Sequence, residues 1–274
     1  HRVTSPGQQA AARPQSLMLS FFGIHVLGTG NAVSTAGLIE VFGRVGVGEE
    51  AVRSTLTRMV GRGLLVRHRV GRKTYFGLTE RAASVLQGGY DRIWHTGAVN
   101  RDWDGTWTLV GYSLPEAWRR ERHDLRSRLV WGGFGLLQNG LWVAPGAVDV
   151  PALVEGLGLD DHLKVFRGAA AAGPTDARTV LETAFDVEAV AEGYRAFLDR
   201  WGAEAEGGGD LARQLLLHTD WLEQVRTDPH LPAEHLPEDW PAARAEELFQ
   251  SLAKAYEGPA RGEAVLLLDT IPVT

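Results

Sequence analysis

The sequence of 274 residues contains no cysteine. Disulfides, and zinc or iron–sulfur sites held by thiolates, are therefore excluded. The sequence also lacks any apolar run near the ~20 residues that span a bilayer, and it lacks the charged-then-apolar layout of a signal peptide. With 44% hydrophobic and 23% charged residues, this composition predicts a globular cytoplasmic protein without membrane contact, long enough for two or three domains.

The charge of the chain is divided unevenly along its length. The overall net charge is -6, which does not favour a simple polyanion-binding protein. Residues 1–100 nevertheless hold 12 basic and 5 acidic residues, a net of +7, whereas the remainder holds 16 and 29, a net of -13. A basic N-terminal third on an acidic body suggests that one module binds a polyanion while the rest has another role.

The N-terminal third has the pattern of three helices followed by a hairpin. An apolar helix is expected over residues 16–27, a second begins behind a Ser34 N-cap, and a third begins after Gly48. Two short strands then flank a glycine turn at Gly71. Three helices and a hairpin within about 65 residues indicate a winged helix-turn-helix.

The stretch Gly46–Ala51 also matches the G-x-G-x-x-G/A pattern of dinucleotide-binding turns. That pattern requires a preceding strand, whereas a helix is expected here. Glu49 and Glu50 would place negative charge where a pyrophosphate should bind. We therefore interpret the match as accidental and expect no bound cofactor.

The third helix is amphipathic, with Val52, Leu56, Met59 and Val60 on one face. An arginine-bearing helix face is often only a solvated surface, but its position before a basic hairpin favours a recognition helix. The predicted DNA-binding residues are Arg53, Ser54, Thr57 and Arg58 on the helix, and Arg67, Arg69, Arg72 and Lys73 on the hairpin.

The rest of the chain divides into two further segments. From Trp103 the pattern is β-α-β-β-α-β, with a helix opening at Pro115 and a hairpin turn at Asn139-Gly140. This is the ferredoxin-like order. The third segment is helical from about Asp186, and its apolar end, AVLLLDTIPV, could form a terminal strand.

The predicted fold class is therefore α+β, with a winged helix-turn-helix, a central ferredoxin-like domain and a helical C-terminal domain. The expected boundaries are a disordered or vector-derived tail (1–15), the DNA-binding domain (16–98), the central domain (99–173) and the C-terminal domain (174–274).

Several segments closely resemble the PaaX-type transcriptional regulators, named for the repressor of phenylacetic acid degradation. The most specific are GVGEEAVRSTLTRMVGRG with the hairpin that follows, GFGLLQNGLWVAP and DPHLPAEHLPEDWPAARA. The resemblance covers roughly residues 15–257. It implies a homodimeric repressor with a winged helix, a Cas2-like central domain and a helical C-terminal domain. It also implies double-stranded operator DNA as partner, and an acyl-CoA effector such as phenylacetyl-CoA that releases the protein from DNA.

The effector site is less well defined by the sequence. Arg119, Arg120 and Arg126 should point outward from their helix, either as a solvated face or as an anion site for CoA phosphates or DNA. His218 lies on an apolar helix face, where a core histidine and an effector contact are both consistent with the pattern. These four residues are the candidate effector-binding residues.

No catalytic residue or metal site is expected. His230, Glu234 and His235 have the wrong spacing for a zinc protease, and Pro232 interrupts the helix that such a site needs. A Cas2-like metal-dependent nuclease is disfavoured because the first central strand, TWTLVGYSL, offers no aspartate. A DNA-binding activator or architectural protein without a small-molecule effector remains the alternative to a repressor.

Overall fold

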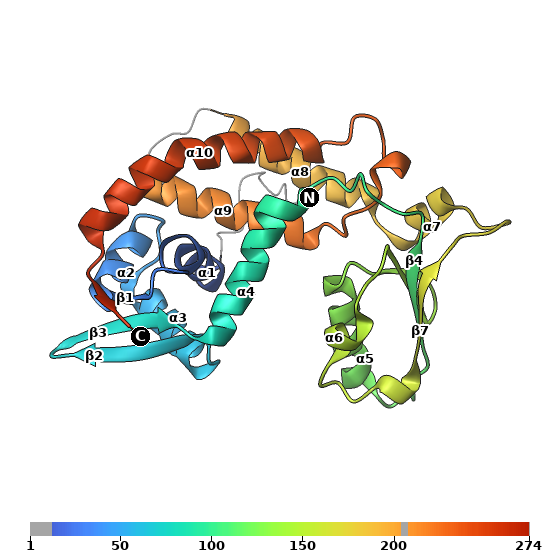
Figure 1. Cartoon of the computed structure of the whole chain (residues 1–274), viewed down its shortest axis with the longest axis horizontal. Coiled ribbons are helices and arrows are strands. Elements are labelled where there is room, and N and C mark those ends of the chain that lie inside the picture. Colours follow the sequence, from blue (N-terminus) through green and yellow to red (C-terminus); the bar gives the residue numbers. More distant parts are fainter. Residues whose placement is uncertain (1–12, 204–207, 274) are drawn as a thin grey trace, which may run out of the picture. The chain divides into compact units, whose positions relative to one another are not determined.

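The computed structural model describes residues 13–203 and 208–273, which form two compact units (Figure 1). The first unit contains the described residues among 13–96, 201–222 and 248–273. The second contains residues 97–200 and 223–247. Most of the tail predicted over residues 1–15 lies outside the described residues, and the first helix begins at Pro14. Within the described residues, no helix is long and apolar enough to cross a membrane.

The first unit begins with the predicted order of three helices and a hairpin. Its elements are α1 (Pro14–His25), β1 (Asn31–Ser34), α2 (Thr35–Gly43), α3 (Glu49–Gly61), β2 (Leu65–Val70), β3 (Lys73–Leu78), α4 (Glu80–Asp91) and a π-helical turn (Arg92–Thr96). Ser34 caps α2 as predicted, because its side chain accepts a hydrogen bond from the Gly37 amide. The short strand β1 was not predicted, because four residues are too few to show a periodicity.

The last strand of the chain completes this sheet. The strand order is β2-β3-β1-β8, in which β8 (Thr270–Pro272) pairs antiparallel with β1. The predicted terminal strand therefore exists, but only as three residues. The preceding apolar residues belong instead to α10 (Ala242–Leu267), which continues beyond the predicted end at Tyr256 and contains Pro259.

The core of the first unit joins segments from both ends of the chain. Leu17, Phe21 and Phe22 of α1 pack with residues of α2 and α3 in one buried cluster. The same cluster contains Leu211 and Leu215 of α9 (Asp210–Thr227), as well as Ala260 and Ala264 of α10. Helices α9 and α10 therefore contribute apolar side chains to the same core as α1.

The second unit contains the predicted β-α-β-β-α-β series. Its elements are β4 (Trp107–Tyr112), α5 (Arg119–Trp131), β5 (Gly135–Gln138), β6 (Leu141–Pro145), α6 (Val150–Val154), a 3-10 turn (Asp160–His162) and β7 (Leu163–Ala169). The sheet is antiparallel with the order β5-β6-β4-β7. This is the order of a ferredoxin-like sheet. Helix α5 connects β4 and β5, which lie on either side of β6, and α6 connects β6 and β7, which lie on either side of β4.

One predicted boundary in this unit was wrong. Helix α5 begins at Arg119 rather than at Pro115, because the chain forms a turn in which the Trp118 amide donates to the Pro115 carbonyl. The Arg122 guanidinium donates to the Leu114 and Pro115 carbonyls at 3.2 Å each, which holds this turn against the first part of the helix.

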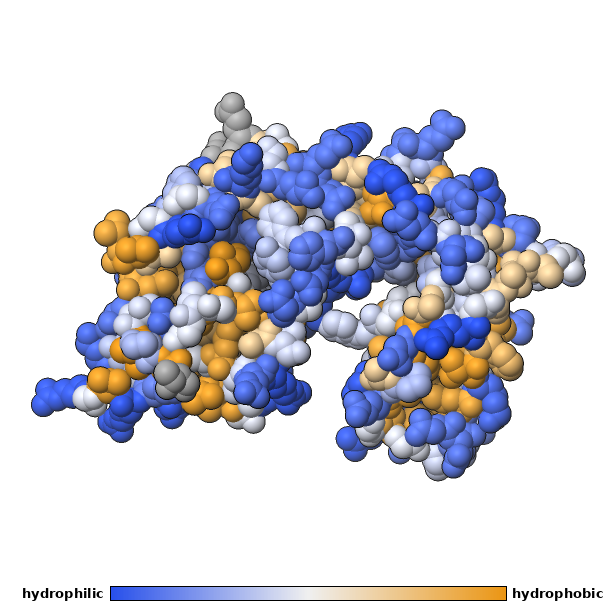
Figure 2. All heavy atoms as spheres, in the orientation of Figure 1, coloured by the Kyte–Doolittle hydropathy of each residue, from blue (hydrophilic) through white to orange (hydrophobic). Residues whose placement is uncertain are grey.

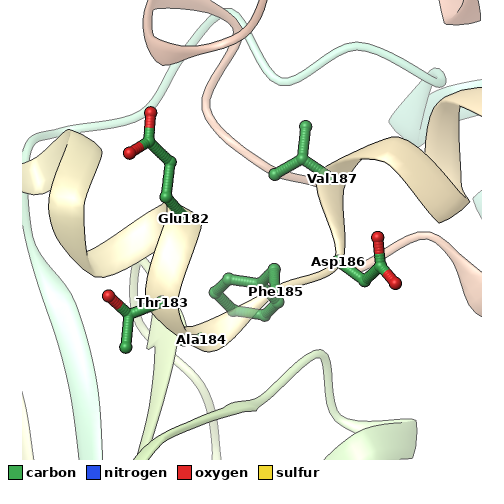
Figure 3. Close-up of a pocket in the computed structure, with 6 residues that line it drawn as sticks. All are labelled: Glu182, Thr183, Ala184, Phe185, Asp186 and Val187. Carbon is green, nitrogen blue, oxygen red and sulfur yellow. The ribbon is translucent and has the colours of Figure 1, made fainter.

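The remaining elements of this unit are α7 (Ala177–Ala184), α8 (Val187–Gly202) and a 3-10 turn (Ala233–His235). Helix α7 was not predicted. Val180 and Leu181 of α7 pack with Trp107 and Val143 of the sheet in a second buried cluster. An open hollow of about 490 Å³ lies where α7 meets α8, with the Phe185 ring between the two helices (Figure 3).

We expect the substitution Leu215→Ala to reduce the free energy of unfolding by about 2–5 kcal/mol, because it leaves a cavity in the joint core. Urea unfolding followed by far-ultraviolet circular dichroism measures the change. Leu266→Ala is the matched control, because Leu266 is 87% exposed on α10, and its effect should stay within about 0.5 kcal/mol. Equal effects of the two substitutions would contradict the described packing.

Candidate nucleic-acid interface

Helix α3 has one buried face and one polar face. Val52, Leu56 and Met59 are buried in the core of the first unit. The four predicted DNA-binding residues of this helix, Arg53, Ser54, Thr57 and Arg58, are all exposed. The structure therefore places all four on the solvent side, where the 3.6-residue period predicts them.

Contacts within the helix hold three side chains of this polar face in place. The Arg53 guanidinium forms an ion pair with Glu49 at 2.8 Å, one turn earlier. Arg58 donates to the hydroxyl of the buried Thr55 at 3.3 Å. The hydroxyl of Thr57 donates to the Arg53 carbonyl at 2.9 Å. These contacts are weak on an exposed helix and can be exchanged for contacts to a ligand.

The hairpin β2–β3 projects from the first unit and ends in hydrophilic side chains (Figures 1 and 2). Gly71 has φ 60 and allows the tight turn, beside which the exposed Arg72 lies. Arg67 is opposite Phe76, and its guanidinium carbon lies 5.8 Å from the centre of that ring. Arg69 is opposite Thr74, so Arg67 and Arg69 share one face of the hairpin.

Lys73 is held by a residue that sequence reasoning missed. Its ammonium group lies 2.8 Å from the Oδ2 atom of Asp269, and the Tyr75 hydroxyl donates to the same oxygen at 2.9 Å. The hydrogen bond from Lys73, reinforced by that from Tyr75, lowers the pKa of Asp269, and the bond to Asp269 raises the pKa of Lys73. Both groups are therefore charged at neutral pH. Asp269 and Lys73 are 196 positions apart, and no local sequence signal links them.

The candidate effector residues fall in two different units. Arg119 and Arg120 of α5 are exposed, and the Arg120 side chain is 90% exposed. Arg126 is also exposed, but its Nε donates to the Tyr112 hydroxyl at 3.1 Å. The three arginines thus point outward, as predicted from the buried Leu125 and Leu129.

His218 lies inside the first unit. Its ring packs 5.2 Å from that of Phe249 and 6.1 Å from that of Trp94. Burial lowers the pKa of His218 from 6.5 to about 4, with a smaller contribution from His25. The imidazole is therefore neutral near pH 7 and supplies no positive charge for an anionic effector.

The residues considered for zinc do not form a metal cluster. His235 lies 3.7 Å from Glu234 and packs its ring 5.4 Å from that of Trp103. In the part of the chain that the structure describes, no group of three or more His, Asp and Glu side chains could hold a metal ion.

Comparison with known proteins decides the family. Residues 13–82 match the model of the PaaX-like protein, residues 100–180 the PaaX central Cas2-like domain, and residues 185–263 the PaaX-like C-terminal domain. The chain belongs to the PaaX family. The match to the central model also confirms the predicted Cas2-like domain.

Two similar proteins extend the comparison. The transcriptional repressor PaaX of Escherichia coli (strain K12) is 26% identical over 259 residues, covering 88% of this chain and 80% of that protein. The structure of the uncharacterized protein Rv0674 from Mycobacterium tuberculosis matches with a TM-score of 0.64 at 22% identity. That match covers 92% of this chain and 99% of the other, and it bears on the fold alone.

We expect stability to fall by roughly 3 kcal/mol as the pH drops from 7 to 4, because the unfolded state protonates His218 below its ordinary pKa and the folded state does not until about pH 4. His25 adds to this slope, since burial also lowers its pKa. Urea unfolding at several pH values tests this expectation. His218→Gln should flatten the slope, whereas the exposed His123→Gln should not. Equal slopes in the wild type and in His218→Gln would contradict the assignment.

Proposed function

We propose that this protein is a transcriptional repressor that binds double-stranded operator DNA through a winged helix-turn-helix. Helix α3 would be the recognition helix, and β2–β3 would be the wing. The observation that carries the proposal is the division of α3 into a buried apolar face and an exposed face of two arginines, a serine and a threonine, followed directly by a basic hairpin. The E. coli relative, named a transcriptional repressor, supports it.

The chemistry of the exposed side chains suits this role. In the major groove, an arginine of α3 can bind a guanine edge bidentately or a phosphate, and Ser54 and Thr57 can donate to either at short range. Arg67, Arg69 and Arg72 on the wing can bind backbone phosphates or enter the minor groove. The DNA-binding domain predicted over residues 16–98 would act as part of the first unit, whose core α9 and α10 complete.

A regulator fits the residues of the central domain better than a nuclease does. Strand β4 carries no aspartate, and the nearby Asp104 accepts hydrogen bonds from the amide and hydroxyl of Thr106 in the turn before the strand. These bonds lower the pKa of Asp104 and give it a local structural role. The relative's function as a repressor also supports a regulator rather than an enzyme.

For regulation, we propose a homodimer that binds two operator half-sites and is released by an aryl-CoA thioester such as phenylacetyl-CoA. Arg119 and Arg120 would be the first candidates for CoA phosphates, because both are exposed. Arg126 is partly engaged by Tyr112, and the neutral His218 could contribute only shape and apolar contact. A ligand with a hundredfold preference for the non-binding state would shift the equilibrium by about 2.7 kcal/mol, enough for induction.

The substitutions Arg53→Ala and Arg58→Ala should each weaken operator binding by about 5- to 150-fold, because each removes a contact of about 1–3 kcal/mol. Fluorescence anisotropy with labelled DNA from upstream of the protein's own gene, against scrambled DNA across a salt series, measures this loss.

The matched control for Arg53 is Arg261→Ala. Arg261 is also an exposed helical arginine paired with a glutamate one turn earlier, here Glu257 at 3.0 Å, but it lies on α10. Its substitution should change affinity less than about twofold, since it removes a similar surface ion pair away from the interface. The interface would be refuted if Arg53→Ala and Arg261→Ala lowered affinity equally.

Phenylacetyl-CoA should release the labelled operator from the wild-type protein, and Arg119→Ala/Arg120→Ala should require at least about tenfold more thioester, since each lost phosphate contact costs ~1 kcal/mol or more. The same anisotropy assay, titrated with the thioester, measures both. Operator binding that ignores every acyl-CoA would favour the alternative, an activator or architectural protein without a small-molecule effector.

A further inference from the structure

We propose that Asp269 is a specificity-determining residue of the DNA-binding surface, which restrains non-specific DNA binding by occupying Lys73 of the wing. This proposal rests on the proposed function, because it concerns the same wing. Asp269 follows the end of α10 and immediately precedes β8, so the C-terminal part of the chain places a carboxylate on the N-terminal hairpin.

The backbone around Asp269 fixes the position of this carboxylate. The Asp269 carbonyl accepts a hydrogen bond from the Ser34 amide at 2.9 Å. The next residue, Thr270, pairs with Val33 of β1, and Ile271 pairs with Ala32. Because the backbone on which Asp269 sits is built into the sheet, its side chain meets Lys73 and Tyr75 without a long flexible connection.

Because side chains alternate along each strand of the hairpin, the contact with Asp269 affects only one of its two faces. Lys73 and Tyr75 lie on one face of β3, whereas Thr74 and Phe76 lie on the other. Arg67 and Arg69 are paired across from Phe76 and Thr74, so they share the face opposite to Lys73. Among the described residues, Lys73 is the cation of the hairpin for which an ion pair is found, and Asp269 is its partner. Asp269 therefore neutralises one face of the wing and leaves the face with the arginines positive.

The consequence for DNA binding follows from the charges. A phosphate that approaches Lys73 must displace an ionised carboxylate or lie beside it, and either arrangement reduces the gain from the contact. In the part of the chain that the structure describes, no ion pair is found for Arg67 or Arg69, so a phosphate that approaches them need not displace a carboxylate. Non-specific binding depends on charge alone. It is therefore limited to orientations in which the arginine-bearing face of the wing meets the DNA.

The test is Asp269→Asn, which removes the negative charge and keeps an oxygen that can accept from Tyr75. On scrambled duplex DNA in about 50 mM salt, we expect the variant to bind roughly 3- to 10-fold more tightly than the wild type. The slope of log affinity against log salt should become steeper by about 0.9, the value for one additional phosphate contact. Fluorescence anisotropy gives both quantities.

Two comparisons separate this explanation from a general charge effect. Glu257→Gln removes the same charge from an exposed ion pair on α10. Because it creates no phosphate contact, its affinity for scrambled DNA should stay within about twofold of the wild type. Its salt slope should stay within about 0.3 of the wild-type slope. In a Lys73→Met background, Asp269→Asn should lose its effect, because the released cation is absent. Circular dichroism melting checks that each variant is folded, and Asp269→Ser provides a second neutral side chain if the asparagine variant is not.

Three results would overturn the proposal. They are unchanged or weaker binding of Asp269→Asn to scrambled DNA, an equal gain in Glu257→Gln, and an undiminished gain without Lys73. If the wild type binds its operator and any of these results is found, this proposal alone fails. If the wild type binds neither operator nor scrambled DNA, the proposed function fails and this proposal fails with it.

Discussion

The first unit depends on the packing of late helices against early ones. Leu211 and Leu215 of α9, with Ala260 and Ala264 of α10, fill the same core as α1, α2 and α3. The small alanine side chains suit a helix that lies close against its neighbours, and the leucines supply the bulk. The orientation of α3, and with it the direction of its arginines, is set by a core that residues far along the chain complete.

Amphipathicity links this core to the proposed function. The same helical period that buries Val52, Leu56 and Met59 leaves Arg53, Thr57 and Arg58 exposed. Three residues, 62–64, separate the end of α3 from the hairpin, so the basic residues of the hairpin follow the helix closely in the sequence. The apolar pattern of α3 therefore orients one set of DNA-binding candidates, and the strand pairing of the hairpin orients the other.

Local signals in the sequence were sufficient for much of this architecture. Ser34 as a cap, Gly71 in a turn and the face of α3 each depend on residues within a few positions. The elements that sequence reasoning missed depend on distant partners. Strand β1 is short and is defined by pairing with β3 and β8, and Asp269 reaches Lys73 across most of the chain. The late start of α5 reflects the turn in which the Trp118 amide donates to the Pro115 carbonyl, and the Arg122 side chain holds this turn against the helix.

The pairing of β8 with β1 also has a consequence for the synthesis of the protein. During translation, the residues of α1, α2 and α3 leave the ribosome long before those of α9, α10 and β8, so the core and the sheet that they share cannot be completed until the late residues have been made. A polypeptide that terminates early would lack part of this core and the strand that follows Asp269. Without β8 and the late part of this core, such a chain would not form the complete first unit.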